Sequence, residues 1–448
     1  MKKFLRLAVV AGLIAAGGIA SVATPAHAAS DGSNGLDCKP DFIVGGGSDT
    51  TQAVMQQLGD AYTNLSGGDL VGSPNFQVTT APCTTPVATT VAPTGSPILN
   101  TPGNYYGNFD KDAVGQATAF GSGAGLSSVC STATGGPFTY GTLSIGFARS
   151  SKDPSAAQLV NCAVWSFAQD GVVFTTYGRT VPNLTKAQIT GIYNGTITDW
   201  SAIAGQAAGA IQVWGLNAAS GTGGTAATYL GLTSVNAATT GGCTTGCGVG
   251  RPLVGSGTCA APTGAFPFEN DHRNIILDPC FDPVNAVWFG SNGEYLTFAY
   301  KRGGTAANNV FYNAQRINLD GKAPSAGNIL LQTYQPTRYL NHVTNKADAS
   351  CAATGTVCNA FPDAATTDFP VIGASSGPGG AVREFTRALC RPTSTVAGGA
   401  NPFDSPAGNS SGALSTQTTV FSDIIASNNF YGVKPGVAPN SRCRVIVG

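Results

Sequence analysis

The sequence contains few charged residues. Asp, Glu, Lys and Arg together make up 10% of its 448 residues, whereas about 25% is usual in globular proteins. The formal net charge is zero, with 23 basic and 23 acidic side chains. Nucleic acids and anionic membranes are bound through basic patches, and this composition argues against such patches. We therefore expect no nucleic-acid partner.

Long apolar runs are also scarce, and the one extended run stands at the N-terminus. Lys2, Lys3 and Arg6 precede it, and Ala26-His27-Ala28 follows as a small-residue cleavage motif. The run is short and interrupted by glycine, which is typical of an export signal rather than a membrane anchor. We predict a signal peptide at residues 1–28 and a secreted chain in an extracellular, periplasmic or cell-surface location. The first cysteine, Cys38, does not follow the signal directly, so a lipid anchor is not expected.

Histidine is rare, whereas cysteine is abundant, with 3 and 12 residues respectively. An even number of cysteines in an exported chain favours disulfides over metal or redox chemistry. The pairs Cys243/Cys247 and Cys351/Cys358 have the spacing of disulfides that close short loops. The sequence does not determine the partners of the other cysteines. Zinc at these pairs is the weaker alternative, because neither has the CxxC spacing. We expect neither a metal nor a cofactor.

Apolar segments of strand length alternate with segments of helical periodicity. Strands are expected at 41–45, 143–147, 172–177, 211–214, 369–373 and 444–447, and helices at 51–65, 184–193 and 379–389. The helix at 184–193 has Thr185 as its expected N-cap and ends at the Asn194-Gly195 turn. This alternation predicts an α/β fold. A mature chain of this length exceeds the usual size of one core, so two domains are expected.

Three turns rich in glycine and hydroxyl side chains are placed to lead into helices. They are Gly47-Ser48-Asp49-Thr50-Thr51, Gly121-Ser122-Gly123 and Ser220-Gly221-Thr222. The first N–H groups of a helix lack partners and its dipole favours negative charge, so such an end can bind an anion. A single turn of this kind is usually only a cap. Three turns that face one cleft would surround a small anion with donors.

The most specific part of the sequence is the segment 184–200. It contains Leu184-Thr185-Lys186-Ala187-Gln188-Ile189 and then Tyr193-Asn194-Gly195-Thr196-Ile197-Thr198-Asp199-Trp200. With the order of the three turns, this segment resembles the phosphate-binding proteins of high-affinity phosphate ABC transporters and their type 2 solute-binding relatives. The resemblance implies a two-lobed, type 2 periplasmic-binding-protein-like fold with an interlobe cleft. Lobe one would then comprise residues 38–172 plus 335–448, and lobe two residues 173–334.

The same resemblance implies ligand-binding roles for the three turns. Ser122 falls on the family's ligand-binding serine, and Ser220-Gly221-Thr222 falls on its anion-binding turn. Asp49 and Thr50 fall on first-loop positions that contact phosphate, and the acidic Asp49 is expected to turn away and cap the helix. The predicted ligand-binding residues are Ser48, Asp49, Thr50, Ser122, Ser150, Ser151, Ser220, Gly221 and Thr222.

Two positions depart from the family pattern. The family's arginine before the anion-binding turn falls on Leu216 or Asn217, so its bidentate cation is missing there. Its aspartate, which accepts the proton of monohydrogen phosphate, falls on Ser150 or Ser151. A hydroxyl can donate or accept, so the pattern does not imply selectivity for phosphate over sulfate. Arg149 or Arg273 is an alternative source of the cation, although a solvated surface arginine is the first interpretation of each.

The resemblance implies extracellular capture of a small oxyanion, phosphate first, for uptake by an ABC permease. The alternative is a secreted cell-surface or structural protein that kept the fold and lost phosphate specificity. A GxSxG motif at 373–377, centred on Ser375, is typical of hydrolases, but no histidine follows it in the chain, so no enzyme is expected. The polar cluster from Glu269 to Arg273 is interpreted as a loop, with the edge of the cleft as the alternative.

Overall fold

The computed structural model describes a large part of the chain. It covers residues 42–66, 70–72, 121–130, 139–140, 143–144, 147–236, 250–301 (without 261, 265, 268, 270–272 and 277), 314–345, 385–386, 389–390, 395–396, 399–400, 402–404, 419–433 and 442–446. Several predictions lie outside these residues, namely the signal peptide at 1–28, the pairs Cys243/Cys247 and Cys351/Cys358, the strand at 369–373 and Ser375.

The main sheet of the described structure contains a continuous path of strands in the order β2-β1-β5-β12-β6-β9-β8. These strands are β2 (Leu70–Gly72), β1 (Phe42–Gly47), β5 (Phe147–Ser150), β12 (Thr337–Asn345), β6 (Cys162–Thr176), β9 (Ala286–Ser291) and β8 (Gln212–Val213). β1 is parallel to β2 and β5, and β8 is parallel to β9, whereas the other neighbours are antiparallel. β10 (Gln315–Arg316), β15 (Tyr431–Gly432) and β16 (Arg444–Ile446) also pair with β6.

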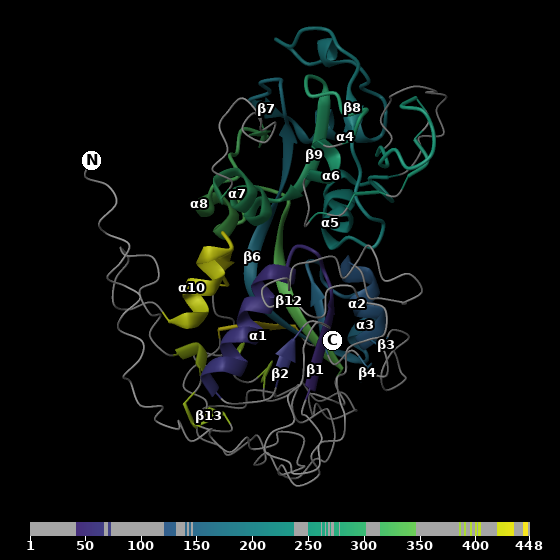
Figure 1. Ribbon diagram of the computed structural model, residues 1–448. Coiled ribbons are helices and arrows are strands. Elements are labelled where there is room, and N and C mark those ends of the chain that lie inside the picture. Colours follow the sequence, from purple (N-terminus) through teal and green to yellow (C-terminus); the bar gives the residue numbers. More distant parts are fainter. Residues whose placement is uncertain are drawn as a thin grey trace, which may run out of the picture.

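Helices flank this sheet at both of its ends. In Figure 1, α1 (Gln52–Ser66), α2 (Gly121–Val129), α3 (Ala156–Leu159) and α10 (Val420–Ser427) lie in the lower part, and α4 (Lys186–Tyr193), α5 (Gly221–Leu230), α6 (Arg273–Ile276), α7 (Asn292–Lys301) and α8 (Ala326–Leu330) lie in the upper part. The remaining elements are short: β3 (Thr139–Tyr140), β4 (Leu143–Ser144), β7 (Asn183–Leu184), β11 (Asn318–Leu319), β13 (Thr395–Val396), β14 (Gly399–Ala400), and two 3-10 turns, η1 (Trp200–Ala202) and η4 (Pro402–Asp404). The predicted α/β class is confirmed.

Two separate clusters of buried apolar side chains form two cores. One cluster draws on residues from Val172 to Tyr334, and the other on residues 54–168 together with 340–443. Figure 1 shows the two corresponding bodies joined by β6 and β12. The fold is therefore two-lobed. We propose the boundaries of lobe one as 38–172 plus 335–448 and of lobe two as 173–334, and the membership of the two cores supports this division.

The strand β6 belongs to both lobes. Its residues from Cys162 to Gly171 pair with β12, and those from Val172 to Thr176 pair with β9. All 15 residues of β6 are buried. The sequence predicted only the last third of this strand, because polar residues and a glycine at 169–171 interrupt the apolar pattern. That polar stretch is tolerated in the middle of the sheet because Asp170 has a charged partner there, as described below.

The helix α4 has the predicted N-cap, Thr185, and the predicted last residue, Tyr193, but it begins at Lys186 rather than at 184. The Gln188 amide donates to Thr185 Oγ1 at 3.2 Å, and the Thr185 amide donates to Gln188 Oε1 at 2.8 Å. This reciprocal pair is a capping box, which satisfies two N–H groups at the start of the helix. Gly195 follows the helix with φ of 80°, a conformation that favours glycine.

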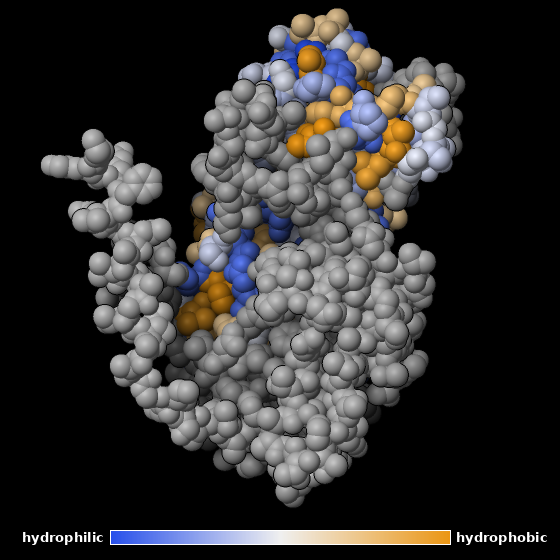
Figure 2. All heavy atoms as spheres, viewed as in Figure 1, coloured by the Kyte–Doolittle hydropathy of each residue, from blue (hydrophilic) through white to orange (hydrophobic). Residues whose placement is uncertain are grey.

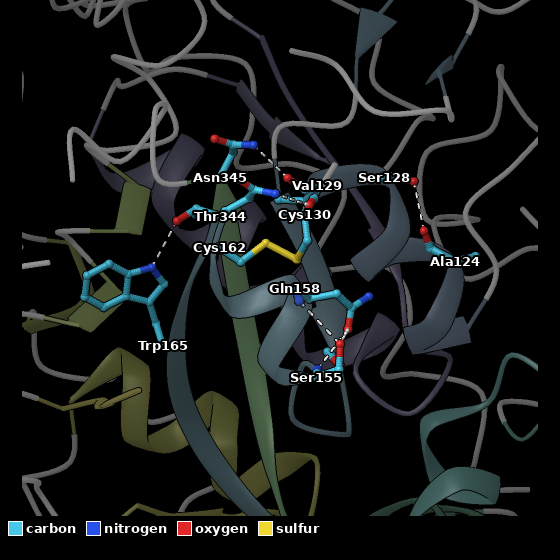
Figure 3. The surroundings of a disulfide bond; sticks show 12 residues. Ala124, Ser128, Val129, Cys130, Ser155, Gln158, Cys162, Trp165, Thr344 and Asn345 are labelled. Carbon is cyan, nitrogen blue, oxygen red and sulfur yellow. Dashed lines mark hydrogen bonds between the residues drawn. A yellow bond between two sulfur atoms is a disulfide. The ribbon is translucent and has the colours of Figure 1, made fainter. Parts of the chain in front are cut away.

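A disulfide joins the end of α2 to the start of β6, as Figure 3 shows for Cys130 and Cys162. Beside it, Asn345 Nδ2 of β12 donates to the carbonyl of Val129 at 2.9 Å. These bonds fix the C-terminal end of α2 against the two crossing strands, and so they help to hold its N-terminal turn in place. Cys259–Cys280 and Cys390–Cys443 are also bonded, so the predicted disulfide chemistry is confirmed.

The visible described surface of lobe two mixes hydrophilic and hydrophobic residues, as Figure 2 shows. Within the described part of the chain, none of the helices combines the length and the apolar character that crossing a membrane requires.

His342 is buried in the core of lobe one. Its ring packs between Phe147 and Phe385, and its Nε2 lies 2.8 Å from Thr386 Oγ1. Burial lowers the pKa of His342 from 6.5 to about 3. Between these two pH values His342 binds more protons in the unfolded chain than in the native protein. Its contribution to the free energy of unfolding therefore rises with pH across this interval and is constant above it.

Replacing His342 by glutamine, which keeps a hydrogen-bonding group for Thr386, should remove this dependence. We expect the native protein to lose stability relative to His342→Gln by about 1.4 kcal/mol per pH unit below about pH 6.5. Urea unfolding of both proteins between about pH 4.5 and 7.5 measures the difference. Parallel stability curves would show that His342 does not titrate between the two states as stated.

Candidate functional site

Five hydroxyl side chains meet between the lobes, four of them from the predicted turns and the fifth from Ser151, which follows β5. Ser48 Oγ donates to Ser151 Oγ at 2.9 Å, and Ser151 Oγ lies 3.2 Å from Ser122 Oγ. Thr50 Oγ1 lies 3.1 Å from Thr222 Oγ1. Each of these five side chains is at most 1% exposed. The fold therefore gathers at one place the three turns that lie far apart in the sequence.

The N-terminal turns of α2 and α5 approach each other directly. The Gly123 amide donates at 3.0 Å to the carbonyl of Ala219, which lies two residues before α5. A Cβ atom on Gly221 would overlap the hydroxyl oxygens of Ser122 and Ser151. Glycine is thus required at 221 by the close approach of the two lobes.

Some of the predicted site residues use their side chains elsewhere. Ser150 Oγ donates to the carbonyl of Lys152 at 2.6 Å, within its own turn. Ser220 Oγ accepts from the Gly223 amide at 3.2 Å and caps α5. These two hydroxyls therefore satisfy local backbone groups, and ligand-binding roles for Ser150 and Ser220 stay a prediction. Asp49 is 3% exposed and lies between Ser48 and Thr50 in the chain.

A guanidinium group that the sequence analysis missed lies against the hydroxyl cluster. Arg338 belongs to β12 and is 6% exposed. Its Nη2 donates to Thr50 Oγ1 at 3.2 Å, and its Nη1 donates to Thr222 Oγ1. Arg338 therefore contacts one hydroxyl from each lobe, and it provides the cation that is missing at positions 216 and 217.

The structure describes one of the two arginines that were considered from the sequence. Arg149 lies in β5 and is 5% exposed, so its interpretation as a solvated surface arginine is wrong. Arg273 begins α6, and its side chain lies outside the described residues.

Asp170 explains why Arg338 can be buried in the sheet. The two residues are directly opposite each other in the pairing of β6 with β12. Arg338 Nη2 and Nε donate to Asp170 Oδ2 at 2.8 and 3.2 Å, and the Gly293 amide donates to Asp170 Oδ1 at 3.1 Å. A buried charge is tolerated when it is paired and its remaining hydrogen bonds are satisfied. Asp170 is thus a positioning residue for the guanidinium group.

Glu269 places a second carboxylate at the cluster. It lies in a turn, as the interpretation of this segment as a loop predicted, and its side chain is only 1% exposed. Glu269 Oε2 accepts from Thr50 Oγ1 at 2.8 Å and also from Thr222 Oγ1. Its Oε1 accepts from the Ser291 amide at 2.5 Å and lies 3.4 Å from Arg338 Nη2. A place at the edge of the cleft stays the alternative for Glu269.

Lys152 adds a second cationic side chain near the two helix ends. Its ammonium would lie 3.7 Å from a Cβ atom built on Gly123, and its Cδ 3.6 Å from one built on Gly224. Burial lowers the pKa of Lys152 from its ordinary value of 10.5. Positive charge beside two helix N-termini is favourable only when an anion balances it, because the N-terminal end of a helix dipole is itself positive.

The chemistry of the site suits an oxyanion. Hydroxyl groups can donate to anionic oxygens, and a guanidinium group can bind two of these oxygens at once. Among the described residues, no group of three or more His, Cys, Asp or Glu is arranged to hold a metal ion. The arrangement offers binding groups for an anion from both lobes rather than an activated nucleophile.

A family model describes part of the chain. Residues 77–266 match the model of a PBP superfamily domain, where PBP denotes periplasmic binding protein. The predicted relation to the solute-binding proteins is thereby confirmed at the superfamily level for this range. The range includes Ser122, Ser151 and Thr222, and it ends before Glu269 and Arg338.

Solved structures of phosphate-binding proteins are also similar to this chain. An ABC-type phosphate transport receptor from Vibrio cholerae is 19% identical, with a TM-score of 0.40, over 67% of this chain and 86% of that chain. A phosphate-binding protein from Stenotrophomonas maltophilia is 14% identical, with a TM-score of 0.39, over 88% of this chain and 91% of that chain. No curated protein matches the sequence.

Proposed function

We propose that the protein is a secreted solute-binding protein that captures a small oxyanion, phosphate first, and delivers it to an ABC permease. One observation carries the proposal: hydroxyls from both lobes, Thr50 and Thr222, meet at the guanidinium group of Arg338. A ligand bound by both lobes stabilises the closed form through its higher affinity for that form. The closed form is what a permease would recognise.

Calorimetry of the mature protein, beginning near Ala29, tests the proposal. We expect saturable heat with phosphate, and titrations with sulfate, molybdate and small carboxylates define the selectivity. The Ser122→Ala/Thr222→Ala double variant should bind phosphate at least about tenfold more weakly, because hydrogen bonds to charged groups contribute about 1.5–3 kcal/mol each. An unchanged affinity in this variant would rule out the pocket.

A matched control uses the same helices one to two turns later. Ser128 Oγ and Thr228 Oγ1 each donate at 2.9 Å to a carbonyl of their own helix, at Ala124 and Gly224. The Ser128→Ala/Thr228→Ala double variant should bind as the native protein does. Absence of heat with every anion would instead favour a cell-surface or structural protein that kept this fold without its ligand.

A further inference from the structure

We infer that the carboxylate of Glu269 is a built-in occupant of the anion pocket, which an incoming oxyanion must displace. The inference rests on the proposed function. It starts from the donors themselves: Glu269 accepts hydrogen bonds from Thr50 and Thr222, the two hydroxyls that Arg338 also contacts. The side chain therefore uses the donors that a bound oxyanion would need.

The charge balance of the pocket makes simultaneous occupancy unfavourable. Arg338 carries one positive charge, and it faces the carboxylates of Asp170 and Glu269. An added anion would share hydrogen-bond donors with a carboxylate that is already there. Like charges in contact repel strongly in a buried site, where solvent screens them little. The anion and Glu269 consequently compete for one place.

The two carboxylates differ in how the fold holds them. Asp170 lies in the central strand β6, directly opposite Arg338. Glu269 lies outside the strands, in the segment between Cys259 and Cys280, which a disulfide closes. A backbone hydrogen bond two residues before Glu269 joins this segment to the rest of lobe two: the Asn217 amide donates to the Pro267 carbonyl at 2.9 Å. Glu269 is attached to the backbone of the sheet through the Ser291 amide of β9, which donates to its Oε1. Its withdrawal would lose that bond but would break no strand pairing.

This arrangement affects which ligands bind and when the lobes close. Without an anion, Glu269 bridges Thr50 of lobe one and Thr222 of lobe two, and so it stabilises the closed lobes. A monocarboxylate offers nothing beyond what Glu269 already supplies. A tetrahedral oxyanion has additional oxygens that reach the hydroxyls of Ser122 and Ser151, so this class of ligand displaces the side chain most readily.

The test compares anion affinities of the native protein and Glu269→Gln by calorimetry with phosphate and with sulfate. We expect at least about tenfold tighter binding of both anions by Glu269→Gln, because a competing charge is removed. Asp278→Asn is the matched control: this buried carboxylate on the same segment accepts from the Val254 and Cys280 amides, and its variant should bind as the native protein does.

Each other outcome has a definite meaning. Weaker phosphate binding with tighter sulfate binding would show that Glu269 accepts the ligand's proton, and would overturn its role as a competitor. Unchanged or weaker binding of both anions would also overturn it, while native binding would leave the proposed function intact. Failure of the native protein and of Glu269→Gln to bind any anion would remove the proposed function itself, and the inference with it.

A second variant keeps the inference testable if Glu269→Gln does not fold. Cys259→Ser/Cys280→Ser retains the carboxylate and loosens the segment that holds it. The double variant should bind phosphate more tightly than the native protein, since Glu269 then leaves the pocket more easily. Weaker binding would mean that the held carboxylate assists the ligand, contrary to the inference.

Discussion

Replacing Arg338 by methionine is expected to weaken phosphate binding by about 30-fold or more and to lower the free energy of unfolding by about 3–5 kcal/mol. The guanidinium group contacts Thr50 and Thr222 from the two lobes and is paired with two buried carboxylates, Asp170 and Glu269. Methionine has a similar volume but no charge. Both carboxylates would then lose their cation, and leaving buried charges unpaired is strongly destabilising. Calorimetry and urea unfolding measure the two effects.

A less buried ion pair provides the comparison. Arg442 pairs with Asp404 at 2.5 Å, and these side chains are 11% and 28% exposed. We expect Arg442→Met to cost less stability and to leave phosphate affinity unchanged, since the pair lies in lobe one away from the hydroxyls. A double-mutant cycle of Arg338→Met with Asp170→Asn should show strong coupling. Additive losses would contradict the pairing.

Replacing Gly221 by alanine is expected to weaken phosphate binding by about 10- to 100-fold. A Cβ atom there would overlap the hydroxyl oxygens of Ser122 and Ser151. Relieving this overlap requires α5 to move away from α2, so the donors of the two lobes would no longer converge. Overpacking of this kind typically costs about 1–3 kcal/mol, and about 1.4 kcal/mol corresponds to a tenfold change in affinity. Calorimetry with phosphate measures the loss.

Gly224 offers a matched control on the same helix. A Cβ atom there meets Lys152 Cδ at 3.6 Å, which is an ordinary contact. Because alanine is a better helix former than glycine, Gly224→Ala should be as stable as the native protein or slightly more so. Equal effects of the two substitutions on affinity would show that the close approach at 221 is not the cause.

The parts of the fold that could be predicted are those that depend on local chemistry. The cap at Thr185 and the turn at Gly195 follow from side chains that bond their own backbone, and the apolar pattern predicted β1 and α1 closely. The strand expected at 143–147 is instead two short strands, β4 and β5. The first ten residues of β6 were missed, because a strand buried on both faces was interrupted in the sequence by 169–171.

The same distinction applies to the candidate site. The turns containing Ser48, Ser122 and Thr222 could be identified because a helix N-terminus has a recognisable sequence. Arg338 and Glu269 could not, because their partners are remote: Arg338 pairs with Asp170 over 168 positions, and Thr50 bonds Glu269 over 219. One signal for Arg338 existed, since this charged residue lies close to the lobe boundary that was expected at residue 335.

The strand shared by both lobes determines how the two halves can part. β6 is hydrogen-bonded to β12 on one side of the crossing and to β9 on the other, and β12 crosses beside it. We therefore expect any opening of the lobes to bend these two paired strands together. We expect this paired connection to return the two lobes to the same relative orientation each time they close. Thr50 and Thr222 would then come back into the same contact at each closure.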